Sequence, residues 1–261
     1  MKDLLLVVPS RGRPGNIARL WEAMQATCQG DTTLLVGLDA DDPTAQSYPQ
    51  GPVYRARAGL RQVVVWINEL TMPLMGGSSP VSDYRYIGHI GDDNVPRTKG
   101  WDVRVMEALE LTPFAFGNDL YPYRPPGALC CHVFCRSEVI RALGYLGPPS
   151  LRHMYVDDVW MAWGQAAGIT FLQDVIIEHL HYSAGKSEPD DNYRESAVYF
   201  GADSAAYTAY CNDPAGLGAD IRKLLDLKAG AGVTHLDDSD RHSGAAQREA
   251  ERFDGEAAPA G

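Results

Sequence analysis

The chain has 261 residues and a formal net charge of −11 at pH 7, with 45% hydrophobic and 22% charged residues. This is the composition of an ordinary globular protein that can bury a sizeable core. The negative charge argues against broad, nonspecific nucleic-acid binding, which depends on Lys and Arg, although a local basic groove stays open. No stretch is long and apolar enough to cross a membrane, and the first apolar run is too short for a signal peptide, so we expect a cytoplasmic protein.

The first part of the chain alternates apolar strand patterns with amphipathic helix patterns. Strands are expected at 4–8, 33–38 and 84–90, helices at 17–24, 59–70 and 100–109, and a Gly/Ser loop at 75–80. This order predicts a parallel, doubly wound α/β sheet with right-handed crossovers. Each of the three strands ends in a polar turn, and such sheets bind ligands at the carboxyl ends of their strands. The sequence therefore predicts a site at this edge.

The second part is less regular. Strands are expected at 114–117, 129–134, 169–172 and 175–181, and helices at 137–143, 157–167, 192–210 and 217–227. From Gly230 onward there are few large apolar residues and seven acidic residues against three basic ones. Such a composition cannot bury a core, so residues 229–261 are expected to form a disordered acidic tail.

The five cysteines indicate neither a disulfide framework nor a zinc site, because their number is odd and none stand in a C-x-x-C spacing. Cys131 lies in LCCHVF, which we expect to be an apolar strand, and Cys135 follows it directly. Cysteine would pack there as a small hydrophobic residue.

The most distinctive pattern is Asp92-Asp93-Asn94 at the end of a predicted strand. Carboxylate and amide oxygens suit a hard divalent cation such as Mg²⁺ or Mn²⁺, which could hold a diphosphate and neutralise its departing oxygen. The alternative is a plain Asp-rich turn, since Asp and Asn favour turns through local hydrogen bonds.

Asp157 and Asp158 open a predicted helix. Carboxylates are favourable at this end of a helix, so one of the two could simply be a cap. The other could act as a base, provided that it reaches the acceptor hydroxyl.

A third pattern, Glu178-His179-Leu180-His181-Tyr182, stands near the end of a predicted strand. Strand geometry places His179 and His181 on the same face, and neutral imidazole is a common metal ligand. Lys186, in the loop that follows, could meet a phosphate or be an ordinary surface lysine.

The order of these patterns resembles the GT-A glycosyltransferases, especially their family-2-like group. The strings DDNVPRTKGWD, VDDVW and EHLHY are similar to small glycosyltransferase-like proteins of bacteriophages. The resemblance spans residues 2–193. It implies one GT-A domain over 1–228 with a Rossmann-like, mostly parallel sheet, in which 1–110 bind the nucleotide sugar and 111–228 bind the acceptor.

The resemblance also implies roles for single residues. The expected donor-binding residues are Pro9, Ser10, Arg11, Asp39, Arg61, Asp92 and Lys186. Asp92, Asp93 and Asn94 stand at the D-x-D metal motif, and His179 at the late metal or diphosphate contact, with His181 as its competitor. Asp157 and Asp158 replace the catalytic Glu-Asp pair, whose second acid, here Asp158, is the base in inverting enzymes. Retention and inversion both stay open.

The expected function is transfer of a sugar from a nucleoside diphosphate sugar, with UDP-sugars first among the donors and Mn²⁺ or Mg²⁺ as cofactor. The acceptor stays open, with a modified DNA base, a protein and a glycan as candidates. Two alternatives remain: a nucleotidyltransferase, for which SRGRPG partly matches a basic Gly-rich loop, and an inactive module that binds nucleotide sugars.

Overall fold

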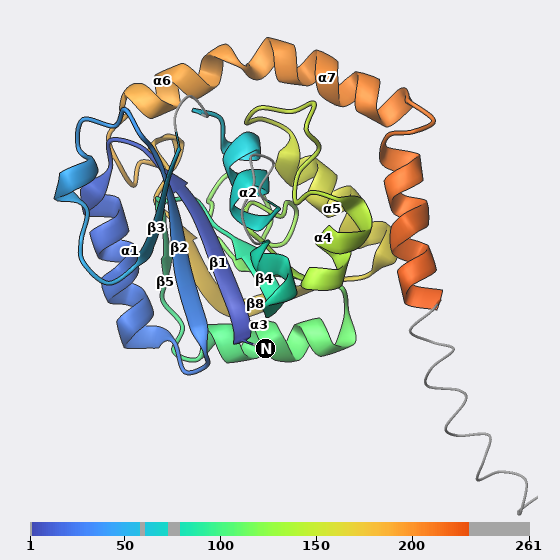
Figure 1. Ribbon diagram of the computed structural model, residues 1–261, viewed down its shortest axis with the longest axis horizontal. Helices are drawn as coiled ribbons and strands as arrows, with labels where there is room; N and C mark the ends of the chain where they lie inside the picture. Colours follow the sequence, from blue (N-terminus) through green and yellow to red (C-terminus); the bar gives the residue numbers. More distant parts are fainter. Residues whose placement is uncertain (1, 58–60, 73–78, 230–261) are drawn as a thin grey trace, which may run out of the picture.

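A computed structural model describes residues 2–57, 61–72 and 79–229. Its centre is an eight-stranded sheet in the order β3-β2-β1-β4-β7-β6-β8-β5. Figure 1 shows strands β1, β2 and β3 side by side in this sheet. The strands are β1 (Lys2–Ser10), β2 (Thr32–Asp39), β3 (Val53–Arg57), β4 (Tyr84–His89), β5 (Asn94–Pro96), β6 (Phe114–Asn118), β7 (Val133–Arg136) and β8 (Ile169–His179). The helices are α1 (Pro14–Thr27), α2 (Val63–Thr71), α3 (Trp101–Leu111), α4 (Ser137–Leu143), α5 (Val156–Ala167), α6 (Asp191–Val198) and α7 (Phe200–Asn212), and one more spans 217–229.

The sheet is mostly parallel, which confirms the predicted α/β class. Parallel pairing joins β1 to β2 and β4, β2 to β3, and β6 to β8. Two strands run the other way: β7 pairs antiparallel with β4 and β6, and β5 pairs antiparallel with β8. The pairing of β5 with β8 matters most for the site, because it places the turn after β4 beside the end of β8.

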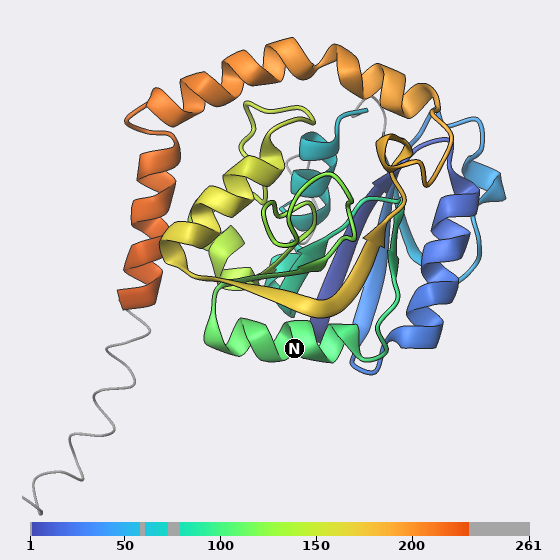
Figure 2. The ribbon, with the colours of Figure 1, turned by 180° about the vertical axis from the view of Figure 1, so that it is seen from behind.

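Strand β1 shows why helices cover both faces of the sheet. Its alternate side chains enter two different cores: Leu5 and Val7 pack with α2, α4 and α5, while Leu4, Leu6 and Val8 pack with α1 and α3. A continuous apolar run is what a strand buried on both faces requires. The helical layers on the two sides are visible in Figures 1 and 2.

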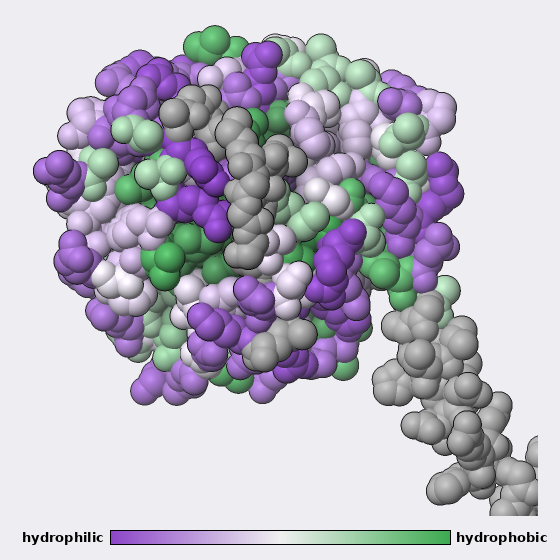
Figure 3. Space-filling model, viewed as in Figure 1, coloured by the Kyte–Doolittle hydropathy of each residue, from purple (hydrophilic) through white to green (hydrophobic). Residues whose placement is uncertain are grey.

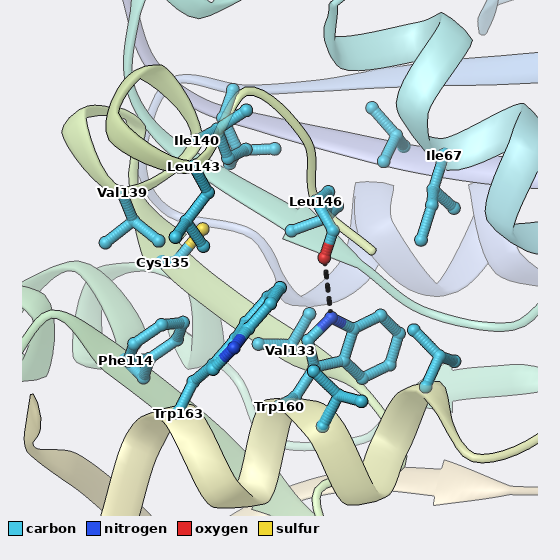
Figure 4. Packing of buried hydrophobic residues seen from close by; sticks show 14 of the residues in the cluster. Ile67, Phe114, Val133, Cys135, Val139, Ile140, Leu143, Leu146, Trp160 and Trp163 are labelled. Carbon is cyan, nitrogen blue, oxygen red and sulfur yellow. Dashed lines mark hydrogen bonds between the residues drawn. The ribbon is translucent and has the colours of Figure 1, made fainter. Parts of the chain in front are cut away.

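The larger core fixes the position of α5. Trp160 and Trp163 project from this helix among apolar side chains of α4, β6 and β7 (Figure 4). The indole Nε1 of Trp160 donates a hydrogen bond of 2.8 Å to the carbonyl oxygen of Leu146. Because this partner satisfies a buried donor, the helix has one well-defined rotation about its axis. That rotation decides which residues of its first turn face the functional pocket.

Several sequence expectations need correction. Residues 129–132 precede β7 rather than forming part of it. The two strands expected at 169–172 and 175–181 are the single strand β8, which ends at His179. The helix expected at 192–210 is divided into α6 and α7, and two short strands, β3 and β5, were not expected. The beginning of the helix at 59–70, most of the 75–80 loop and the tail from 230 lie outside the described residues.

The C-terminal helices arch over one side of the sheet (Figures 1 and 2). Asp203 of α7 is 1% exposed, and its carboxylate accepts hydrogen bonds from the amides of Arg152, His153 and Met154 at 2.8–3.2 Å. These bonds fix α7 to the segment that leads into α5. Within the described ranges, no helix is long and apolar enough to cross a membrane. Figure 3 shows the described hydrophobic residues of one face in small groups between hydrophilic ones.

The last helix is anchored by a buried carboxylate, and this anchor can be tested. Asp220 is 1% exposed and accepts hydrogen bonds from the hydroxyls of Tyr145, at 2.5 Å, and Tyr210, at 2.6 Å. Asp220→Ala should lower the free energy of unfolding by about 2–4 kcal/mol, because two phenol hydroxyls lose their acceptor. Urea unfolding measures the change.

The matched control is Asp226→Asn, on an exposed position of the same helix. It should change the free energy of unfolding by less than about 0.5 kcal/mol. Equal stability of Asp220→Ala and the wild type would show that the residues 217–229 are not part of the cooperative fold.

Candidate active site

A pocket of about 320 Å³ lies at the carboxyl ends of β1, β2 and β4, where the sequence predicted a site. The end of β8, the first turn of α5 and one side of α6 complete its walls. Expected site residues that line it are Pro9, Ser10, Arg11, Asp39, Arg61, Asp92, Asp93, Asn94, Asp157, His179 and the competing His181. Lys186 and Asp158 are not among the lining residues.

Asp93 and His179 form the centre of this pocket. One carboxylate oxygen of Asp93 lies 3.3 Å from Nε2 of His179, and the other accepts a hydrogen bond of 2.7 Å from the hydroxyl of Tyr193. Backbone pairing brings these two side chains together. Asn94 pairs with His179 across β5 and β8, and the amide of Leu180 donates to the carbonyl of Asp93. Burial raises the pKa of Asp93, but His179 and Tyr193 outweigh it and hold this pKa below its usual range.

Asp92 has a different environment. It is 7% exposed, and its two oxygens accept hydrogen bonds from Oγ of Ser10, at 2.7 Å, and Nη1 of Arg13, at 2.8 Å. Burial raises its pKa to about 6, against the opposing charge of Arg13. Asp92 therefore pairs with Ser10 and Arg13, whereas Asp93 is the acid that faces His179.

The residues present fit a divalent cation with few protein ligands. Asp93 and His179 offer one carboxylate and one imidazole, and no group of three or more His, Cys, Asp or Glu side chains suited to a metal occurs within the described ranges. Mg²⁺ sites commonly use one or two carboxylates, with substrate phosphates and water as the other ligands. Asn94 fits less well as a ligand, because its side-chain oxygen already accepts the amide of Gly91 at 3.0 Å.

His179, rather than His181, is the histidine that faces Asp93. The imidazole of His181 instead contacts the rings of Tyr182 and Tyr193, and its Nδ1 accepts the amide of Ser183 at 3.2 Å. Lys186 points elsewhere. Its ammonium lies 3.0 Å from Oε1 of Glu178 and donates to the carbonyl of Leu120.

Asp39 organises the other end of the pocket. It is 2% exposed and accepts hydrogen bonds from the indole of Trp66 and the amide of Arg61, both at 3.1 Å. The guanidinium of Arg11 lies 3.3 Å from its second oxygen. Arg61 has a left-handed backbone with φ 40°, which is uncommon for a residue with a side chain and is a feature of ligand-binding loops.

Asp157, rather than Asp158, faces the pocket from α5. Neither acid is the N-cap residue, which is Tyr155, but a carboxylate oxygen of Asp157 accepts the first-turn amide of Asp158 at 3.2 Å. Burial and, secondarily, the charge of Asp158 raise the pKa of Asp157 to about 6. A carboxyl group with a raised pKa in a pocket is suited to proton transfer near neutral pH. The geometry therefore moves the candidate base from Asp158 to Asp157.

Cys131 lies beside this acid, in contrast to the expectation of a packed strand cysteine. It stands before β7 in the pocket wall, with its sulfur 3.9 Å from Oδ2 of Asp157. Burial raises the pKa of the Cys131 thiol above its usual range, so it is a neutral neighbour of the acid.

Arg13 is the main residue that sequence reasoning missed. Its side chain is 12% exposed, and its guanidinium lies between Asp92 and Asp190, 4.4 Å from the ring centre of Tyr193. Burial lowers the pKa of Arg13, but the two carboxylates outweigh it and keep the guanidinium charged. The available signal was a second arginine in the loop SRGRPG, directly after β1.

His89 was missed as well. It ends β4 and lines the pocket, where Nδ1 donates to the carbonyl of Val7 and its ring packs against Trp160. Burial lowers its pKa to about 4, so it is neutral at physiological pH. Its position in an apolar strand gave no sign that its side chain lines the pocket.

The sheet order, its covering helices and the pocket at its carboxyl edge define a GT-A fold. No model of a protein family matches the sequence, and no curated protein matches it either. Similarity appears among solved structures. The chain is similar to glucosyl-3-phosphoglycerate synthase from Mycobacterium tuberculosis in complex with Mn²⁺, UDP and phosphoglyceric acid, with a TM-score of 0.51 and 12% identity over 82% of this chain and 80% of that one.

A second similar structure is TarS from S. aureus, with a TM-score of 0.52 and 9% identity; it covers 86% of this chain, which spans only 42% of TarS. A mannosyltransferase from Pyrobaculum calidifontis in complex with GDP-Man and Mn²⁺ overlaps with a TM-score of 0.49 and 10% identity over 88% of this chain and 79% of that one. At these identities the similarities to glucosyl-3-phosphoglycerate synthase and to TarS, each with a TM-score above 0.5, show the fold alone.

Proposed function

We propose that this protein is a metal-dependent glycosyltransferase that uses a nucleoside diphosphate sugar. The observation that carries the proposal is the pairing of Asp93 with His179 in the same pocket as Asp157. The first two suit a divalent cation and the third suits proton removal. The GT-A fold supports this arrangement, and the M. tuberculosis enzyme of the same fold was solved with Mn²⁺ and UDP.

The donor would extend along the pocket from Asp39 toward Asp93. Asp39 and the neighbouring Arg11 and Arg61 would hold the nucleoside, and Arg13 would stabilise the diphosphate. Asp93 and His179 would hold Mn²⁺ or Mg²⁺. When bound, such a cation supplies Lewis-acid stabilisation of charge on the departing phosphate oxygen.

Asp157 would accept the proton of the acceptor hydroxyl. The acceptor oxygen then forms a bond to the anomeric carbon of the sugar, while the bond between that carbon and the phosphate oxygen breaks. The electron pair of the broken bond leaves with the nucleoside diphosphate. A single displacement of this kind inverts the configuration at the anomeric carbon, so Asp157 as a base implies an inverting enzyme.

The donor can be identified by measuring thermal stability with UDP- and GDP-sugars, each with Mn²⁺, with Mg²⁺ or with EDTA. A matching donor at about a hundred times its Kd should stabilise the fold by about 2.7 kcal/mol, and the effect should vanish with EDTA. Slow release of the nucleoside diphosphate should accompany binding. Release of pyrophosphate instead would indicate a nucleotidyltransferase, and no response to any nucleotide sugar would count against the proposal.

A further inference from the structure

Helix α6 lies across the carboxyl ends of β1 and β2 and closes one side of the pocket (Figures 1 and 2). Its contacts to the site are hydrogen bonds and the packing of one ring, that of Tyr193, against His181, Tyr182 and the guanidinium of Arg13. None of its eight residues is buried, and Asn192 donates a hydrogen bond of 2.6 Å to the carbonyl of Arg11. Because none of its side chains is fully buried and only the ring of Tyr193 packs closely, the helix can leave the site at a small hydrophobic cost.

The first of these contacts concerns Arg13. The N-cap residue of α6, Asp190, accepts two hydrogen bonds of 2.7 Å from Nε and Nη2 of this guanidinium. The opposite side of the guanidinium donates to Asp92. A guanidinium fork binds a phosphoryl group in the same bidentate manner as a carboxylate. Asp190 therefore lies where an anion of the donor would bind Arg13.

The second contact concerns Asp93. The hydroxyl of Tyr193 donates a hydrogen bond of 2.7 Å to one carboxylate oxygen of Asp93, and Nε2 of His179 lies 3.3 Å from the other. Both oxygens of the acid best placed for a cation are thus engaged, one of them by α6. The same helix contacts the cation-binding acid and the anion-binding arginine.

We propose that α6 is a self-inhibitory latch, in which Asp190 competes with the phosphoryl groups of the donor for Arg13 and Tyr193 competes with the divalent cation for Asp93. The inference rests on the proposed function. Donor and cation together release the helix, while α7 stays in place because the buried Asp203 binds three backbone amides. Access of the donor therefore depends on the strength of this latch.

The test compares Asp190→Asn with Asp191→Asn in the full chain. Asn caps a helix about as well as Asp, so the first change removes the charge of the competitor and keeps the cap bond to the amide of Tyr193. Asp191 is the adjacent carboxylate; its side chain is 86% exposed and pairs with Arg194 on the helix surface. It is therefore a matched control without contact to the site.

The measurement is the Kd of UDP and of GDP by calorimetry at fixed Mn²⁺ concentration. Asp190→Asn should bind the preferred nucleotide about tenfold more tightly than the wild type, as expected when a charge-assisted competitor is weakened, and Asp191→Asn should match the wild type. Tyr193→Phe should bind Mn²⁺ at least about threefold more tightly than the wild type, since the change frees one oxygen of Asp93. This second measurement needs no nucleotide.

The opposing outcomes are distinct. Suppose that Asp190→Asn binds the nucleotide as tightly as the wild type, or more weakly. Asp190 then only positions Arg13, and the latch is overturned while the proposed function stands. If no variant binds either nucleotide with Mn²⁺, both the function and the latch fail.

Discussion

Asp157→Asn is expected to lower the rate of sugar transfer by about a hundred- to ten-thousandfold, the usual effect of losing a general base. The amide has nearly the shape of the carboxylate and can still accept the amide hydrogen of Asp158, a bond of 3.2 Å in the wild type. It cannot take a proton from the acceptor. Because Asp157 stands in the first turn of α5, whereas Asp39 ends β2 and Arg13 follows β1, affinity for the donor should stay nearly unchanged. Transfer rate and donor Kd are measured side by side.

Asp158→Asn is the matched control, one residue along the same helical turn. Its side chain is not part of the pocket wall, so the transfer rate should change little. A silent Asp157 with a critical Asp158 would reverse the assignment and restore the role expected from the sequence. If both variants keep full activity, neither acid is the base.

The pH dependence of Asp157 gives this prediction a second readout. Transfer requires the ionised carboxylate, so the wild-type rate should fall as the pH drops through about 6, the raised pKa of this group. The free energy of unfolding changes in the opposite direction to the rate as the pH rises. The folded-state pKa lies above the unfolded value of about 3.9, so the ionised group costs stability once the pH rises through the interval between the two values.

The cost is fully present at pH 7, and Asp157→Asn should therefore raise the free energy of unfolding there by about 1–3 kcal/mol. Near pH 4, where the wild-type group is protonated when folded, most of this gain should vanish. Urea unfolding at both pH values checks the difference. A substitution that removes activity but raises the free energy of unfolding is typical of a functional residue held in a strained site. Replacing a purely structural acid would lower the free energy of unfolding.

The sequence predicted the edge of the sheet that carries the site because parallel strands end on the same side. Ser10, Asp39 and Asp93 are far apart in the chain, yet each follows an apolar run that is long enough to identify as a buried strand. Knowing the strands is then enough to bring their ends together. The same reasoning placed His179, although it could not separate it from His181.

The contacts of α6 could not be predicted in this way. Asp190 meets Arg13 across 177 positions of the chain, and no local pattern marks an arginine whose partner arrives from a distant helix. The choice between Asp157 and Asp158 was open for a different reason. Successive residues of a helix point about 100° apart, and here the direction is set by the left-handed Tyr155 and the anchored Trp160. Neither feature has a signature in the sequence.

Asp93→Asn is expected to weaken binding of Mn²⁺ by at least about a hundredfold, because even the loss of an outer-shell partner of a metal costs about ten- to a hundredfold. The change replaces an anionic ligand by a neutral amide and removes the charge that faces His179. Donor binding that depends on Mn²⁺ should weaken in parallel, and transfer should fall below detection. Mn²⁺ binding is measured by the loss of the electron paramagnetic resonance signal of the free ion, which requires no substrate.

Asp92→Asn is the control that decides which of the two adjacent acids binds the cation. The oxygens of Asp92 already accept hydrogen bonds from Ser10 and Arg13, so its amide variant should disturb the position of Arg13 and weaken Mn²⁺ binding far less than Asp93→Asn does. Thermal unfolding of both variants shows whether they keep the fold. Should Asp92→Asn abolish Mn²⁺ binding while folded Asp93→Asn retains it, the cation would have to lie on the Ser10 side of the turn. In that case His179 could not share it, because the imidazole meets Asp93 alone among the two acids.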